Sequence, residues 1–91
     1  MHWRLFANLA ETASEREVDV EVGPNATFAD ALAALFERHP ELEAEVLDED
    51  GELYPHIQAL RNGEHVVEQD GFDTRLDSGD ELALFPPVSG G

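Results

Sequence analysis

The feature that most restricts the fold is one amphipathic segment, Phe28–Arg38, in a chain whose other apolar segments mostly alternate with polar residues. Its large apolar side chains recur at helical spacing and form a single stripe, which predicts a helix with one buried face. Thr27 and Asp30 have the T-x-x-D spacing typical of a helix start. Pro40 cannot continue a helix, so we expect the helix to end at Arg38. A helix of this kind needs a second layer to cover its apolar face.

Segments of alternating apolar and polar residues lie on both sides of this helix and predict the strands of the second layer. The clearest is Glu17–Val22, in which valines alternate with acids. Asn62-Gly63 predicts a two-residue hairpin turn. Asn8–Arg16 fits a loop or a short helix. We expect strands at His2–Ala7, Glu17–Val22, Ile57–Arg61, Glu64–Glu68 and Glu81–Phe85, with Leu53-Tyr54 as a candidate for a further short strand.

This order of elements predicts a two-layer α+β domain, in which the helix packs across one sheet. On the last strand, Leu82 and Leu84 share one face and we expect them to point toward the helix. Phe85 then points the other way, where an exposed aromatic side chain could anchor a partner. The alternative is that Phe85 covers a small secondary core. No linker or repeat divides the chain, so we expect one domain over residues 1–86, followed by an extended tail over residues 87–91.

The charge of the chain indicates its surroundings. It carries 21 acidic residues against 5 basic ones, a formal net charge of −16, and all the basic residues are arginines. Such repulsion opposes compaction unless salt screens it, so we interpret the chain as adapted to a high-salt cytoplasm, as in a halophile; an ordinary acidic protein is the alternative. The charge argues against binding to nucleic acid or anionic membranes, and repulsion between copies favours a monomer. No apolar run could span a bilayer and no signal-peptide layout is present, so we expect a cytoplasmic protein.

No residue pattern typical of catalysis or metal binding is present. The chain has no cysteine, and its four histidines lack metal-ligand spacing. The acidic stretch Asp48-Glu49-Asp50-Gly51 does not match a calcium loop, because Val46 and Ile57 would occupy ligand positions. No glycine-rich phosphate loop is found. We therefore expect a protein that is not an enzyme and that holds no metal and no bound cofactor.

The C-terminus carries the clearest functional signal. The last strand runs into Pro86-Pro87, which must end it and which stiffen the exit. The residues beyond Pro86 can reach about 17 Å when extended, and the final glycines, without a Cβ, could enter a narrow channel. The alternative is a frayed terminus without a role. We expect a partner to bind this region and to hold the terminal carboxylate deep inside it; the residues concerned are Phe85, Pro86, Pro87, Val88, Ser89, Gly90 and Gly91.

The ending Asp80-Glu81-Leu82-Ala83-Leu84-Phe85-Pro86-Pro87-Val88-Ser89-Gly90-Gly91 resembles that of the MoaD-like sulfur carriers, the small subunits of molybdopterin synthase. A helix on a sheet with a C-terminal Gly-Gly is similar to the ubiquitin-like β-grasp proteins. The acidity, the Leu60-Arg61-Asn62-Gly63 hairpin and the opening Trp3–Ala10 make the chain similar to the haloarchaeal small archaeal modifier proteins of that branch. The resemblance covers essentially the whole chain. It implies a β-grasp fold, with a mixed sheet, one main helix across it and a flexible Gly-Gly tail.

The resemblance also implies a function. An E1-like enzyme would use ATP to adenylate Gly91, because a free carboxylate is a poor electrophile. The activated carbonyl would then form an isopeptide bond with a lysine of a target protein. Alternatively it would become a thiocarboxylate that donates sulfide, with the large subunit of molybdopterin synthase as partner, in molybdenum cofactor biosynthesis. The sequence does not separate these fates. In such carriers the residue matching Phe85 lies at the partner interface.

Two further expectations complete the interpretation. The chain has no lysine, so it could not be extended into lysine-linked polymers of itself. A different class of function stays open: a non-catalytic β-grasp subunit of a complex, whose Gly-Gly tail is inert.

Overall fold

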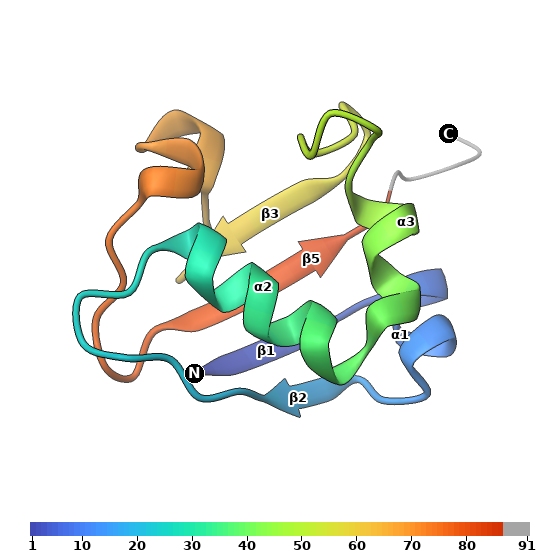
Figure 1. Ribbon diagram of the computed structural model, residues 1–91, viewed down its shortest axis with the longest axis horizontal. Coiled ribbons are helices and arrows are strands. Elements are labelled where there is room, and N and C mark those ends of the chain that lie inside the picture. The colour runs from blue at the N-terminus through green and yellow to red at the C-terminus, as the bar shows by residue number, and fades with distance from the viewer. Residues whose placement is uncertain (87–91) are drawn as a thin grey trace.

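A mixed five-stranded sheet forms one layer of the computed structural model, which describes residues 1–86. The strand order is β2-β1-β5-β3-β4, with β1 and β5 parallel at the centre and the other neighbours antiparallel. Helix α2 crosses one face of the sheet (Figure 1), which confirms the predicted two-layer α+β architecture. The predicted tail lies outside the described residues. The strands are β1 (His2–Leu5), β2 (Glu17–Asp19), β3 (Gln58–Arg61), β4 (Glu64–His65) and β5 (Glu81–Phe85).

The main helix, α2 (Phe28–Arg38), begins and ends at the predicted residues. Its start is fixed by a capping box, because the Thr27 hydroxyl accepts a hydrogen bond from the Asp30 N–H at 3.3 Å. In return, the Asp30 carboxylate accepts one from the Thr27 N–H at 2.9 Å. Two backbone donors that the helix itself leaves without partners are thereby satisfied.

The core lies between α2 and the sheet. Trp3 of β1 is fully buried, with its ring edge-on to Phe28 at 5.5 Å between centroids and its indole N–H donating to the Ala31 carbonyl at 3.2 Å. The polar atom of the largest core side chain is therefore satisfied inside the core. Leu82 and Leu84 of β5 are also fully buried, so the predicted inward face of the last strand is confirmed.

Four strands are shorter than predicted, because pairing decides where a strand ends. The third loses one residue, since it begins at Gln58 and not at Ile57. The first strand stops at Leu5, and Ala7, predicted to be its last residue, opens helix α1 (Ala7–Ala13) with a φ of 52°. The helical alternative for the following segment is thus confirmed. The second strand ends at Asp19 and does not reach Val22. Beyond it, Val20 still exchanges two backbone hydrogen bonds with Met1, at 2.9 and 2.7 Å.

The hairpin after β3 has the predicted turn, with positive φ at Asn62 and Gly63, the type I′ geometry that matches the twist of the strands. The predicted length of the return strand, Glu64–Glu68, is wrong. It ends at His65, and Val66–Glu68 forms a 3-10 turn instead. This turn buries Val66 completely, which a straight continuation of the strand on alternating faces would not require.

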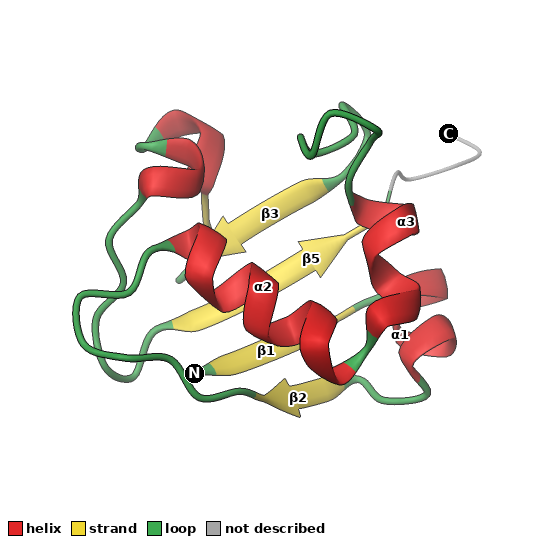
Figure 2. Cartoon of the chain, viewed as in Figure 1, coloured by secondary structure: helices red, strands yellow, loops and turns green. Residues whose placement is uncertain are grey.

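The acidic stretch after α2 contains an element that the sequence analysis did not predict. A 3-10 turn (Pro40–Leu42) leads into the short helix α3 (Glu43–Val46), and the two bury Leu42 and Val46. The candidate strand at Leu53-Tyr54 reduces to one isolated bridge, between Leu47 and Leu53. Helices α1 and α3 lie at the end of the sheet where β1 and β5 finish (Figure 2).

Candidate functional site

Two aromatic rings meet where β5 ends. Phe85, the last residue of β5, stacks on Phe6 with ring centroids 4.1 Å apart and planes 13° from parallel. Parallel pairing explains the meeting, because the register places Arg4 beside Ala83 and the two phenylalanines follow two residues later on each segment. Phe6 is 36% exposed and Phe85 is half-buried. We call Phe6 and Phe85 the ring pair.

The ring pair lies on the sheet face opposite α2. Alternation along β5 buries Leu84 against the core and turns Ala83 and Phe85 outward. Beside Ala83, the β3 register places the half-buried Leu60. Together they form a small apolar surface next to the point where the chain leaves the sheet. The alternative interpretation was that Phe85 covers a small secondary core. Phe85 is half-buried against Phe6, but the Phe6 ring itself is exposed, so the two rings do not form a closed core.

Of the predicted partner-binding residues, the structure describes only Phe85 and Pro86. Phe85 points away from the helix, as the alternation of the strand predicted, and Pro86 is buried. The other predicted site residues, Pro87, Val88, Ser89, Gly90 and Gly91, lie outside the described residues, and their roles stay predictions. Phe6 was not predicted as a site residue, since nothing in its local sequence indicates which strand will lie beside it.

A cluster of polar side chains fixes the start of the same strand. The buried Asp80 carboxylate accepts hydrogen bonds from Arg61 Nε at 2.7 Å, from the Asp77 N–H at 2.7 Å and from Asn62 Nδ2 at 2.9 Å. Burial raises the pKa of Asp80, but these hydrogen bonds outweigh it, so its pKa lies below the ordinary value. Asn62 Oδ1 also accepts from the Glu81 N–H at 2.9 Å. The hairpin turn is thereby tied to the first residue of β5, which ends at the ring pair.

A histidine ties the edge strand β2 to β1. His2 Nδ1 lies 2.8 Å from Asp19 Oδ1, and His2 Nε2 lies 2.8 Å from Glu17 Oε1. The hydrogen bond with Asp19, followed by the one with Glu17, outweighs partial burial and raises the pKa of His2. The same hydrogen bond lowers the pKa of Asp19.

Residues 1–86 are the part of the chain for which metal ligands and membrane-spanning helices can be described. In this part of the chain no group of three histidine or carboxylate side chains is placed to hold a metal ion. Over the same residues, no helix has both the length and the apolar character that crossing a bilayer requires.

Comparison with known proteins gives consistent results. The sequence model described as the ThiS family matches residues 3–91. Small archaeal modifier protein 1 of Haloferax volcanii is 55% identical over 91 residues, which is 100% of both chains. The molybdopterin synthase sulfur carrier subunit of Chlamydomonas reinhardtii is 37% identical over 86 residues, 94% of this chain and 92% of that one. The crystal structure of SAMP1 from Haloferax volcanii superposes with a TM-score of 0.91 at 55% identity, covering 100% of this chain and 98% of that one.

Proposed function

The chain belongs to the ThiS family, and from that premise we propose that it is a ubiquitin-like protein modifier, a sulfur carrier, or both, acting through the carboxylate of Gly91. The predicted resemblance and the β-grasp fold are confirmed by the match to the family and to SAMP1. One observation carries the proposal: full-length identity of 55% to a small archaeal modifier protein. The Gly90-Gly91 ending gives that identity its chemical meaning.

The chemistry requires an activating partner. A carboxylate resists nucleophilic attack, so an E1-like enzyme transfers the adenylyl group of ATP to the Gly91 carboxylate and releases pyrophosphate. A lysine amine of a target protein can then attack the acyl carbon and expel AMP, which leaves an isopeptide bond. Hydrosulfide can attack the acyl carbon instead and expel AMP, which leaves a thiocarboxylate. With the large subunit of molybdopterin synthase as partner, this thiocarboxylate donates sulfide in molybdopterin synthesis. We propose that these partners supply the catalytic groups and bind the ATP. We place the reaction in the cytoplasm, where ATP is available.

In this scheme the ring pair is the surface that the activating enzyme binds. Exposed aromatic side chains in an apolar surface are typical anchors of protein interfaces. Phe85 and Phe6 hold each other in place, and the cluster around Asp80 fixes the other end of β5. The residues after Pro86 span at most about 17 Å when extended, so the terminal carboxylate can lie no farther than that from Pro86, which follows directly on Phe85. Binding on the ring pair would therefore set how far into the enzyme the carboxylate extends.

The two fates can be told apart by mass spectrometry of material from cells. The intact protein should gain a mass equal to the difference between sulfur and oxygen if it carries sulfur, once oxidation of Met1 is excluded. Peptides from other proteins should carry a C-terminal remnant on lysine if it is conjugated. Deleting Gly90-Gly91 should abolish both signals. Persistence of either signal would refute the proposal, and unchanged partner binding and phenotype after the deletion would indicate an interaction subunit with an inert tail.

A further inference from the structure

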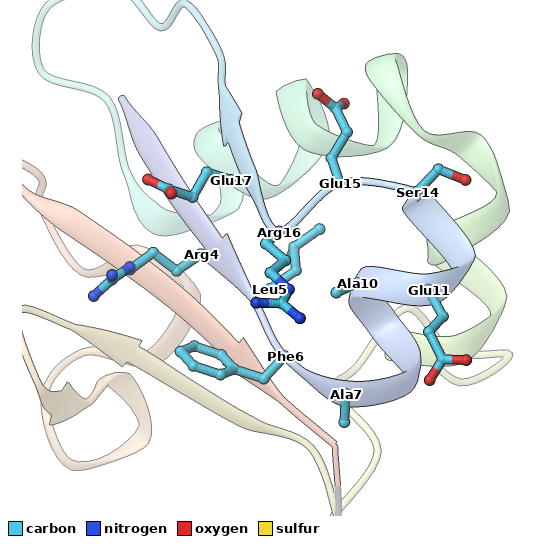
Figure 3. A pocket seen from close by; sticks show the side chains of 10 residues that line it. All are labelled: Arg4, Leu5, Phe6, Ala7, Ala10, Glu11, Ser14, Glu15, Arg16 and Glu17. Atoms are coloured by element: carbon cyan, nitrogen blue, oxygen red, sulfur yellow. The ribbon is translucent and has the colours of Figure 1, made fainter.

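A surface groove of about 620 Å³ lies beside the ring pair, between the end of β1, helix α1 and the start of β2 (Figure 3). Its size is within the range of about 300–1,000 Å³ that ligand-binding clefts occupy. Phe6 lines the groove, so one ring of the ring pair belongs to both features. Arg4 and Arg16, two of the five basic residues of this strongly acidic chain, line it as well.

Arg16 brings a positive charge that residues 1–86 do not neutralise. Within this part of the chain its guanidinium takes part in no ion pair and no hydrogen bond, whereas Arg4 lies 3.4 Å from Glu81. The backbone of Arg16 is fixed, because its carbonyl accepts a hydrogen bond from the Leu5 N–H at 2.7 Å. In Figure 3 its side chain extends into the groove on the side of Phe6.

The acids around the groove leave this guanidinium accessible to an outside partner. Glu15 is engaged by His39, with Oε2 at 2.8 Å from Nε2, and Glu17 by His2 at the same distance. Figure 3 shows these two carboxylates, and that of Glu11 on α1, directed away from the centre of the groove. Three nearby acids are thus turned outward while one arginine is turned inward.

We propose that this groove binds a carboxylate side chain of the activating enzyme, with the Arg16 guanidinium as its anchor. The inference rests on the proposed function and names the contact that would orient the carrier. Arginine forms two parallel hydrogen bonds with a carboxylate, which gives direction as well as affinity. With a net charge of −16, most of the surface repels an acidic segment, so such a segment is directed to this groove. Because Phe6 is shared, one stretch of the partner can contact the groove and the ring pair together.

The test measures binding of the full-length chain to its E1-like enzyme, at one fixed KCl concentration, for four proteins. They are the wild type, Arg16→Glu, Arg16→Gln and the control Arg75→Glu. Arg75 is a matched control, because it is exposed, forms no side-chain ion pair within residues 1–86, and lies opposite Thr27 at the start of α2. Arg75→Glu changes the net charge by the same amount as Arg16→Glu.

We expect Arg16→Glu to raise Kd about tenfold or more, as for the minority of interface residues that carry most of the binding energy, and Arg75→Glu to leave it within about twofold. Arg16→Gln should fall between them, and it decides the question if the Glu variant fails to fold by circular dichroism. Equal changes for Arg16→Glu and Arg75→Glu, or no change for either Arg16 variant, would overturn the inference and leave the proposed function standing. Absence of wild-type binding would overturn both.

Discussion

Replacing Phe6 and Phe85 by alanine, singly and together, tests the ring pair in stability and in binding. Truncating a fully buried phenylalanine costs about 3–5 kcal/mol, and both rings are only partly buried, so we expect each single variant to lose about 1–2 kcal/mol. The near-parallel stack at 4.1 Å adds a coupling of about 0.5–1.5 kcal/mol between them. The double variant should therefore lose less than the sum of the single losses.

The assay is equilibrium unfolding in urea at constant KCl. Binding to the E1-like enzyme is measured on the same proteins, which are the wild type, the two single variants, the double variant and a control. Urea is used because it does not change the ionic strength that screens the acidic surface. A small domain typically has about 5–15 kcal/mol of stability, so the single variants should remain folded. Val67→Ala is the control, since Val67 is 70% exposed and such surface changes usually stay within about 0.5 kcal/mol.

In binding, we expect Phe85→Ala and Phe6→Ala to raise Kd by about tenfold each, while Val67→Ala leaves it unchanged. A coupling near zero would show that the rings do not stack in solution. Normal affinity and normal adenylation of Phe85→Ala would refute the proposal that the activating enzyme binds the ring pair.

Three further predictions concern the hydrogen bonds of Asp80, those of His2 and the net charge of the chain. Asp80→Ala should lower the free energy of unfolding by about 3 kcal/mol, because it removes a buried carboxylate and leaves Arg61 Nε without its acceptor, while Arg61 Nη2 keeps its bond to Asp77. Since the native pKa of Asp80 is lowered, its contribution is present above the ordinary value of 3.8 and is lost as pH falls through the native pKa, so the variant should show a flatter acid limb in urea titrations. The raised pKa of His2 predicts a contribution that is complete below the ordinary value of 6.5 and is lost as pH rises through the native pKa; His2→Gln should remove this slope, and an unchanged slope would show that the contacts with Glu17 and Asp19 do not form in solution. Far-ultraviolet circular dichroism should show unfolding as KCl falls from about 1 M to about 0.01 M, because the Debye length rises from about 3 Å to about 30 Å; full folding at the lower concentration would contradict the halophile interpretation, which the similarity to Haloferax volcanii proteins supports.

Elements with local signals were predictable from the sequence. The bounds of Phe28–Arg38 follow from a capping box, an apolar stripe and a proline, all within a few residues of the helix. The last strand, Glu81–Phe85, is bounded by prolines that cannot join the ladder. Asn62-Gly63 adopts the turn that its residue types favour. In each case the physical cause lies in the segment itself.

Features that depend on distant pairing were not predictable. The second strand pairs with β1 from Glu17 to Asp19, which lies opposite His2, and this register is not visible in the local pattern of Glu17–Val22. The 3-10 turn before helix α3 buries Leu42, and α3 itself buries Val46. Two apolar residues among acids are too few to indicate a helical period. Phe6 joins Phe85 only because β1 and β5 lie side by side in parallel, with most of the chain between them in sequence. The roles of Gly90 and Gly91 lie outside the described residues and stay predictions.

The central claim is that another protein activates the carboxylate of Gly91, and formation of the acyl-adenylate tests it most directly. Purified wild-type chain, ATP and the E1-like enzyme should give a carrier adenylate with release of pyrophosphate. Gly91→Val should give none while folding normally, because its branched side chain would not fit the narrow channel that we expect in the partner. No adenylate from the wild type, or equal adenylation of Gly91→Val, would contradict the claim.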